Sequence, residues 1–376
     1  MKVCFWGNIT GALIGKTEGG GELQIAFIAK ALAASGNEVI IVDFEVNEDF
    51  ITTDGIKIKS IRNWNKGIRI LRTVTHRIPS LFKALAEQNA DVYYCRIRDF
   101  RHIIAYRVAR KLNSKFVLHM ASDLDAMNLR SRLRSYYFYN RTTLWLFFSG
   151  ILLEIIQPWL LRHADLVLVQ HSGQKKILVQ KNIKPVVFYN MIDLSKIPAG
   201  KSYPHSDFVY VGWLDRRKGF PELFKLIELS PTHTFKIIGP PRDEIGLHYY
   251  EKLKSFRNVK LLGICSHSKT IDEISKSKAL ISTSRMEGFP NVFIEAWACG
   301  IPVYSLNVDP GNIIEKEGLG VFANGNFDIL KTALDEHFDQ PGFAMKAKKY
   351  VEKYHAINKS KVEEINSIFK EVYDRK

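Results

Sequence analysis

The sequence predicts an α/β chain with two consecutive, doubly wound domains. The chain has 376 residues, which is more than one hydrophobic core usually serves. Apolar, strand-like runs alternate with segments of helical spacing in two separate series, and this alternation is typical of parallel sheets covered by helices. A stretch rich in Pro, Gly and Ser at 194–207 separates the two series and is the best candidate for a linker.

The first series opens with a strand, a glycine-rich loop, a helix that ends at Gly36 and a buried strand with an acidic residue at its end. This order implies a parallel sheet. The strands that we expect in this series are 2–7, 37–44, 91–97, 115–121, 164–170 and 185–190, and the helices are 23–36 and 101–112.

The second series continues the alternation and is followed by a charged helical segment. We therefore expect domains at 1–196 and 205–345, and a helical tail at 346–376 that packs back towards the first domain. Ligands of such sheets bind beyond the carboxyl ends of the strands, which here means the cleft between the domains. The expected strands are 208–212, 234–239, 259–263, 278–284 and 301–306, with helices at 220–229, 246–256, 269–277 and 291–299.

Charge is concentrated in one part of the chain. The formal net charge is +15, and residues 60–141 hold 17 Lys and Arg against 5 Asp and Glu, a net charge of +12. Such a field attracts polyanions such as nucleic acid, anionic lipid headgroups or phosphorylated substrates. The alternative is a solvated basic face without a partner. A nucleic-acid-binding protein would explain the charge, but we find no RNA- or DNA-binding motif.

Cysteine usage and the N-terminus favour a cytoplasmic protein. The four cysteines are scattered, without a CxxC pair or a nearby histidine cluster, which favours a reducing compartment and argues against a structural zinc site. The first fifteen residues contain no long apolar run before the glycines, so we expect no signal peptide.

The stretch RMEGFPNVFIEAWACGIPVYS at 285–305 places two glutamates, Glu287 and Glu295, around a Gly-Phe-Pro turn. Pro290 fits the first turn of a helix, so we expect the amides of 291–293 to be unpaired donors that suit a phosphate. Gly288 permits close approach of a ligand, and carboxylates accept hydrogen bonds from sugar hydroxyls. The alternative is that Glu287 is a surface loop residue and Glu295 a partly exposed helix residue.

Other polar residues also follow predicted strands. Arg216, Arg217 and Lys218 follow one strand closely, where a solvated basic turn is the alternative. His119 ends another strand and Asp123 follows it, although a single histidine at a strand end is more often structural. The loop with Gly19, Gly20 and Gly21 lets a ligand approach the backbone, but it is not a GxGxxG fingerprint, so we do not expect NAD binding.

Several segments resemble retaining glycosyltransferases of family 4 (glycosyltransferase group 1), which have the GT-B fold of two Rossmann-like domains facing a central cleft. The run EGFPNVFIEAWACGIPV resembles their E-x7-E signature. The resemblance covers most of the chain and is weakest over 60–160. The other similar segments, in order, are GGGELQIAFIAKALAASGNEV, ADLVLVQHSGQKKIL, PVVFYNMID, FVYVGWLDRRKGFPELFKLI and NVKLLGICSHSKTIDEISKSKALISTSRMEG.

By position, the resemblance implies roles for these residues. Glu287 would contact hydroxyls of the donor sugar, Glu295 the ribose of the nucleotide, and Lys218 the departing diphosphate. The family's arginine is replaced by Trp213, for which Arg216 or Arg217 would compensate. Glu287, Lys218 and His119 are the implied catalytic residues, and the implied donor-binding residues are Glu295, Gly288, Phe289, Pro290, Asn291, Val292, Arg216, Arg217, Gly263, Ile264, Gly20 and Gly21.

The resemblance further implies retention of the anomeric configuration without a metal or other cofactor. We expect transfer of a sugar from a nucleotide sugar to a saccharide or lipid-linked saccharide, in the synthesis of a surface polysaccharide or glycolipid. The positions of the two domains in the family imply that the first binds the acceptor and the second the donor. The alternative is a non-catalytic nucleotide-sugar-binding protein of GT-B fold, which the change at Trp213 favours.

The segment near 128–162 is basic and then apolar, but Glu154, Gln157 and Pro158 argue against a membrane span. One interpretation is a buried helix of the first domain, another a protein–protein contact. The third is an interfacial element of a peripheral enzyme on the inner face of the cell membrane. It would place Arg130, Arg132, Arg134 and Arg141 at anionic headgroups and Trp145, Phe147 and Phe148 in the bilayer.

Overall fold

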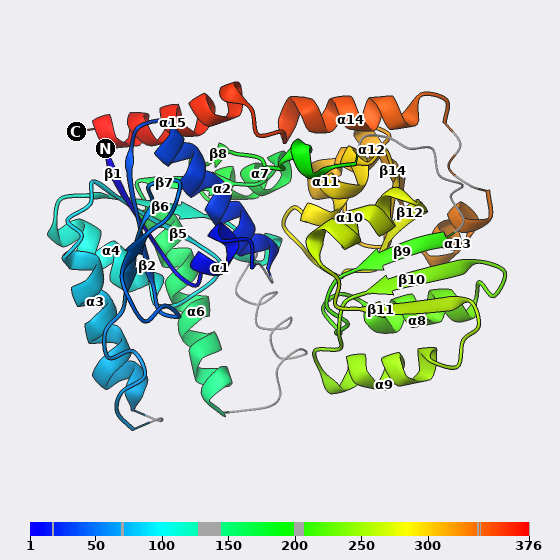
Figure 1. Ribbon diagram of the computed structural model, residues 1–376, viewed down its shortest axis with the longest axis horizontal. Coiled ribbons are helices and arrows are strands. Elements are labelled where there is room, and N and C mark those ends of the chain that lie inside the picture. The colour runs from blue at the N-terminus through cyan, green and yellow to red at the C-terminus, as the bar shows by residue number, and fades with distance from the viewer. Residues whose placement is uncertain are drawn as a thin grey trace. The chain divides into compact units, whose positions relative to one another are not determined.

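The computed structural model describes residues 1–16, 19–68, 71–126, 144–198, 207–336, 338 and 340–375, with the backbone alone for 144–149. The chain forms two compact units (Figure 1). Unit 1 combines Met1–Met191 with Asn358–Lys376, and unit 2 comprises Ile192–Ile357.

Unit 1 contains a sheet of eight strands in the described residues, in the order β3-β4-β2-β1-β5-β6-β7-β8. All neighbouring strands are parallel apart from β3 and β4. The strand order reverses between β1 and β5, which is therefore the topological switch point of this sheet. The strands are β1 (Lys2–Trp6), β2 (Glu38–Asp43), β3 (Phe50–Ile51), β4 (Lys57–Ser60), β5 (Val92–Arg96), β6 (Lys115–His119), β7 (Leu166–Val169) and β8 (Val186–Val187).

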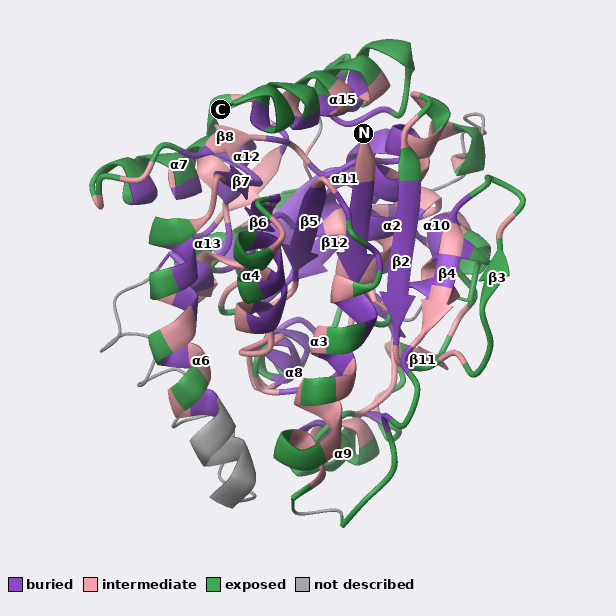
Figure 2. Ribbon diagram, turned by 90° about the vertical axis from the view of Figure 1, so that its left-hand side faces the viewer, coloured by how far each residue is buried: buried purple, intermediate pink, exposed green. Residues whose placement is uncertain are grey.

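Helices cover both faces of this sheet, because alternate strand residues point to opposite sides. On β1, Val3 and Phe5 join one hydrophobic cluster, and Cys4 and Trp6 join the other. Figure 2 shows β1, β2 and β5 buried along most of their length, whereas β3 is exposed at the edge. The helices are α1 (Thr10–Leu13), α2 (Gly20–Ala34), the π-helical η1 (Thr73–Arg77), α3 (Ile78–Ala86), α4 (His102–Lys111), η2 (Asp123–Asp125), α6 (Leu144–His163), α7 (Ser172–Val179) and α15 (Lys359–Asp374).

Unit 2 contains a second parallel sheet, with six strands in the described residues, in the order β11-β10-β9-β12-β13-β14. Its order reverses between β9 and β12, which form the switch point of this unit. The strands are β9 (Asp207–Val211), β10 (Thr234–Ile238), β11 (Val259–Gly263), β12 (Ser277–Ser282), β13 (Val303–Ser305) and β14 (Gly320–Phe322). The helices are η3 (Leu194–Lys196), α8 (Phe220–Glu228), α9 (Glu244–Leu253), α10 (His267–Ser275), α11 (Asn291–Ala298), η4 (Pro310–Asn312), α12 (Ile313–Lys316), α13 (Phe327–Glu336) and α14 (Phe343–Tyr354).

The predicted fold class, two doubly wound α/β units, is confirmed. The tail differs from our expectation of one segment at 346–376. Its first helix, α14, packs against α11 in unit 2, and α15 packs against α2 in unit 1, where Asn366 accepts a hydrogen bond from Asn37 (2.8 Å). The last part of the expected linker, 199–206, lies outside the described residues.

Candidate functional site

The switch point of unit 2 brings together two residues that the sequence singled out separately. Lys218 follows β9 and Glu287 follows β12, and Lys218 Nζ lies 2.6 Å from Glu287 Oε1. Burial by itself would raise the pKa of Glu287, but the ammonium of Lys218, the charge of Arg217 and a hydrogen bond from Ser284 hold it below its usual value. Glu287 is therefore an ionised carboxylate whose main partner is a lysine.

The backbone around Lys218 is held by hydrogen bonds from two strand ends. Its amide donates to Asp215 Oδ1 (2.7 Å), and its carbonyl accepts from the hydroxyls of Tyr210 (3.2 Å) and Thr283 (3.3 Å). Gly219 has a φ of +69°, and a Cβ there would lie 1.9 Å from the carbonyl oxygen of Thr283. Glycine is therefore required for the loop to pass this close to the end of β12.

The start of α11 corrects one expectation about the helix amides. Pro290 is the N-cap residue with extended backbone (φ −63°, ψ 124°), rather than a residue of the first turn. The amide of Phe293 donates to the carbonyl of Pro290 (3.1 Å), so the prediction that it is unpaired is wrong. The side chain of Phe289 is buried against Trp297 and His355, which leaves its backbone, and not its ring, to meet a ligand.

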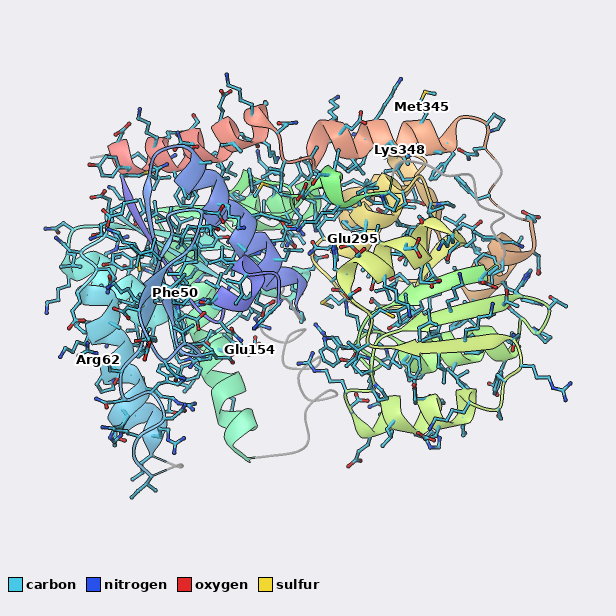
Figure 3. The ribbon with its side chains drawn as sticks, in the orientation of Figure 1. Phe50, Arg62, Glu154, Glu295, Met345 and Lys348 are labelled. Carbon is cyan, nitrogen blue, oxygen red and sulfur yellow. The ribbon has the colours of Figure 1, made fainter. Side chains whose placement is uncertain are left out.

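Glu295 is buried on α11 and bonded to a residue that sequence reasoning missed. His267 Nε2, at the start of α10, lies 3.0 Å from Glu295 Oε1 (Glu295 is labelled in Figure 3). This hydrogen bond raises the pKa of His267. Gly263 and Ile264 lie nearby in sequence at the end of β11, where Gly263 adopts φ +63° and Ile264 is 81% exposed.

Trp213 has an arginine against its ring that the sequence did not point to. The guanidinium carbon of Arg242, from the turn after β10, lies 5.1 Å from the centre of that ring. Arg217 is exposed, and the amide of Arg216 donates to Asp243 Oδ2 (3.2 Å). Arg242 is therefore a further basic residue beside the position where the family has an arginine.

His119 lies at the end of β6 in unit 1 and is buried. Its Nδ1 is 2.8 Å from the hydroxyl oxygen of Tyr94 and 3.4 Å from Arg96 Nη1. Burial, reinforced by the charge of Arg96, lowers the pKa of His119 well below its usual value. The imidazole is therefore neutral at physiological pH. Asp123, the weaker candidate, lies in η2 and accepts hydrogen bonds from His171 Nε2 and Gln174 Nε2.

The segment predicted as a glycine loop, Gly19 to Gly21, is largely helical. Gly19 is the N-cap of α2, and Gly20 and Gly21 form its first turn. A Cβ on Gly21 would lie 3.0 Å from Ile97 Cδ1, so this glycine lets α2 approach the end of β5. The expectation of a loop at Gly20 and Gly21 is wrong, because α2 already begins at Gly20.

The predicted membrane-contact residues fall mostly outside the described residues. Arg130, Arg132, Arg134 and Arg141 are among those not described, and Trp145, Phe147 and Phe148 are described only as backbone at the start of α6. Within the described chain, no helix is long and apolar enough to span a bilayer.

Further along α6, Glu154 is buried and bonded to Arg98 Nη2 (2.6 Å), and Figure 3 labels Glu154. The side chains of the same helix also include exposed Leu152 and Ile155. Among the described residues, no group of three or more His, Cys, Asp or Glu side chains is arranged to hold a metal ion.

Comparison with known proteins supports the resemblance. Residues 198–354 match the family model of glycosyl transferases group 1. Over 170 residues, the chain is 27% identical to the amylovoran biosynthesis glycosyltransferase AmsD of Erwinia amylovora, covering 44% of this chain and 48% of AmsD. It is 25% identical over 185 residues to an uncharacterized 41.2 kDa protein in the cps region of Klebsiella pneumoniae, covering 45% of this chain and 50% of that protein. The chain thus spans about half the length of the curated relatives it matches.

Solved structures share the fold across the whole chain. Sucrose-phosphate synthase from Thermosynechococcus elongatus has a TM-score of 0.78 at 14% identity, covering 99% of each chain. HepE of Anabaena, in complex with UDP and glucose, has a TM-score of 0.69 at 17% identity, covering 99% of this chain and 98% of HepE. Residues 198–354 therefore match the model of glycosyl transferases group 1, and the chain has the GT-B fold.

Proposed function

We propose that this chain is a retaining glycosyltransferase that moves a sugar from a nucleotide sugar to a saccharide or lipid-linked saccharide. The observation that carries the proposal is the Lys218–Glu287 pair at the switch point of unit 2, inside the matched residues 198–354. Switch points are where doubly wound sheets bind ligands. The structures of HepE with UDP and glucose and of TarM from S. aureus with UDP and α-GlcNAc-glycerol support a nucleotide sugar as the donor.

In this reaction the bond between the anomeric carbon and the diphosphate oxygen breaks, and the anomeric carbon bonds to the acceptor oxygen on the same face. The acceptor's hydroxyl proton passes to the departing diphosphate, so no separate protein base is needed. Lys218 stabilises the charge that develops on the diphosphate, which is the main form of catalysis available here. We propose that the step needs no metal or cofactor.

Both glutamates have basic partners before a donor arrives. Glu287 accepts from Lys218 and Glu295 from His267. Sugar and ribose hydroxyls then bind through the remaining acceptor sites, since a carboxylate has about four lone-pair sites. The backbone of Gly288, Pro290 and the first residues of α11 completes the donor site, and Gly263 and Ile264 contact the base.

The biological setting that we propose is the synthesis of a surface polysaccharide or glycolipid. Its support is the two curated relatives, of which one is named for amylovoran biosynthesis and the other lies in a cps region.

We also propose that the enzyme is cytoplasmic and binds the inner face of the cell membrane through unit 1. Close to the start of η1, Ile68, Leu71 and Val74 are exposed at 70%, 53% and 65%. Basic residues flank them in the sequence, in the part of the chain with a net charge of +12. Such a combination suits an anionic bilayer.

The membrane proposal is tested by sedimentation with anionic liposomes at low salt. Binding should fall for a Leu71→Ser, Val74→Ser double variant, and a matched Leu247→Ser variant of the exposed leucine on α9 should bind like wild type. Wild type that ignores the liposomes would contradict the proposal.

A non-catalytic nucleotide-sugar-binding protein remains the second candidate, favoured by Trp213 in place of the family's arginine. The two are separated by incubating the chain with nucleotide sugars and lipid-linked saccharide acceptors, and measuring the nucleoside diphosphate released. A transferase releases it with wild type and much less with Lys218→Ala. Binding without release would overturn the proposed transferase.

A further inference from the structure

Arg96 is a buried arginine at the switch point of unit 1. It ends β5, beside His119 on the neighbouring strand β6, and is 3% exposed. Its Nη2 donates to Asn190 Oδ1 (2.8 Å) and its Nη1 faces His119 Nδ1 (3.4 Å). Across the residues that the structure describes, no carboxylate lies within 4.0 Å of this guanidinium. The carboxylates of Asp125 and Glu22 act on this charge only from a greater distance, and a buried charge without a direct ion pair is unfavourable, so a structural role alone explains it poorly.

The backbone after Arg96 is also unusual. Ile97 has a φ of +68°, which is rare for a β-branched residue because Cβ crowds the backbone. This turn directs the two neighbouring arginines to different partners. Arg96 meets His119 and Asn190, whereas Arg98 binds the buried carboxylates of Asp125 and Glu154. Strained residues of this kind cluster at functional sites.

The hydrogen bonds around His119 determine which ring nitrogen carries its proton. An arginine can only donate, so its Nη1, 3.4 Å from His119 Nδ1, requires that nitrogen to accept. The Tyr94 hydroxyl can donate its proton to the same nitrogen, 2.8 Å away. Both neighbours of Nδ1 are therefore donors, and Nδ1 must accept. In a neutral imidazole the proton then lies on Nε2.

His119 Nε2 itself is buried and has no hydrogen-bond partner in the described part of the chain. A buried donor of this kind normally has a partner. An oxygen of a bound ligand could accept this hydrogen bond. A ligand N–H or O–H group could not donate to Nε2, because Nε2 already carries a hydrogen atom.

We propose that Arg96 is a positioning residue, which together with Tyr94 holds His119 as a neutral Nε2–H donor to an oxygen of the bound saccharide. The identity of the ligand as a saccharide rests on the proposed function, but the position of the proton on His119 does not. His119 then orients a ligand oxygen and does not act as the general base. This agrees with a transfer in which the acceptor proton leaves with the diphosphate.

The first test determines which ring nitrogen of His119 carries the proton, in the absence of any ligand. Nitrogen-15 NMR of histidine-labelled full-length protein should give an unprotonated Nδ1 and a protonated Nε2 for His119, assigned by the signal lost in His119→Gln. The pattern should stay unchanged over roughly pH 6 to 8. A protonated Nδ1, or titration near the usual histidine pKa, would overturn the proposal.

Tyr94→Phe is the sharpest variant, because the ring keeps its contacts with Phe5 and Phe369 while the hydroxyl is lost. We expect a larger fraction of the Nδ1–H form of His119. Arg96→Met should raise the pKa of His119 towards its usual value, and Arg96→Lys should raise it less because the charge remains. If Arg96→Met does not fold, Tyr94→Phe decides; an unchanged His119 spectrum in Tyr94→Phe would contradict the proposal.

The second test uses sugar transfer. The side-chain amide of His119→Gln can place an N–H near the position of Nε2, whereas that of His119→Asn lies near Nδ1. We expect His119→Asn to lose about 10²–10³-fold in kcat, as for removal of one transition-state donor, and His119→Gln to lose much less. Equal losses with a pH profile governed by one group near the histidine pKa would overturn the proposal. Absence of any transfer by wild type would contradict the proposed function, and the NMR result would still decide the role of Arg96.

Discussion

The two sheets use a basic residue at their switch points in opposite ways. In unit 2, Lys218 is partly accessible and bonded to the carboxylate of Glu287, with side-chain exposures of 19% and 14%. In unit 1, Arg96 is buried with the amide of Asn190 and the imidazole of His119 as hydrogen-bond partners, and no carboxylate among the described residues forms an ion pair with it. The lysine can exchange its partner for an anionic ligand, whereas the arginine is fixed and acts through its neighbours.

This difference is also seen in how each residue is held. Lys218 extends from a loop whose backbone is fixed by Asp215, Tyr210 and Thr283, so its side chain can move while the loop stays in place. Arg96 is itself part of a strand, and its side chain is fixed by the contacts that it makes. We infer that unit 2 contributes charge stabilisation and unit 1 contributes orientation.

The largest effect that we expect is on turnover. Lys218→Ala should lower kcat by about 10²–10³-fold, the cost of losing one group that stabilises transition-state charge. Steady-state kinetics with the preferred nucleotide sugar measure it. The matched control is Lys254→Ala, which removes an exposed lysine paired with Glu251 and should leave kcat unchanged. A kcat within twofold of wild type for Lys218→Ala would contradict the role of Lys218 in charge stabilisation, and with it the contrast that we draw with Arg96.

The next effect concerns the loop that holds Lys218. Gly219→Ala should lower the free energy of unfolding by about 3 kcal/mol, because a Cβ meets the Thr283 carbonyl and φ is positive. Denaturant unfolding measures the change. Gly342→Ala is the control, since φ is +77° but no described atom lies within 4 Å of its Cβ, and its loss should be about 1 kcal/mol. Equal losses would show that the close approach to Thr283 is unimportant.

The smallest effect that we expect is a pH dependence of stability that arises from His267, the partner of Glu295. The bond to Glu295 raises the folded-state pKa of His267, while burial and, to a smaller extent, the charge of Lys196 oppose this rise. The pair therefore stabilises fully below the unfolded pKa, about 6.5, and this contribution is lost as the pH rises through the folded value. The stability advantage of wild type over His267→Gln should shrink as the pH rises. The change should be small, since His267 is 49% exposed; an advantage that grows with pH would contradict the pairing.

Most of the fold and several candidate site residues could be predicted from the sequence, because these residues follow predicted strands. The side chains that contact the site residues could not be predicted. The alternation of apolar runs located most strands, and Lys218 and Glu287 were candidates because each follows one. Short edge elements such as β3 and β14 carry too few residues for a periodic signal. The run YYCRIRD likewise does not reveal that Arg96 is buried, because an arginine at a strand end is usually solvated.

The partners that the sequence did not predict were missed for one common reason. Arg242 reaches Trp213 from the turn after the next strand, and His267 reaches Glu295 from a different helix. Such pairs depend on strand order and side-chain direction, which one sequence does not specify. The resemblance to family 4 supplied roles for Glu295 and Lys218 but no role for Arg96, Arg242 or His267.

The central claim is that unit 2 binds a nucleotide sugar at its switch point, and a thermal-shift screen tests it most directly. Wild type and Glu295→Ala are heated with UDP-, GDP-, ADP- and CMP-sugars. We predict that one nucleotide class raises the melting temperature of wild type, as expected for a ligand bound to the folded state, and has little effect on the variant. No shift with any of the four, or an equal shift in both proteins, would contradict the assignment of Glu295 and of this site.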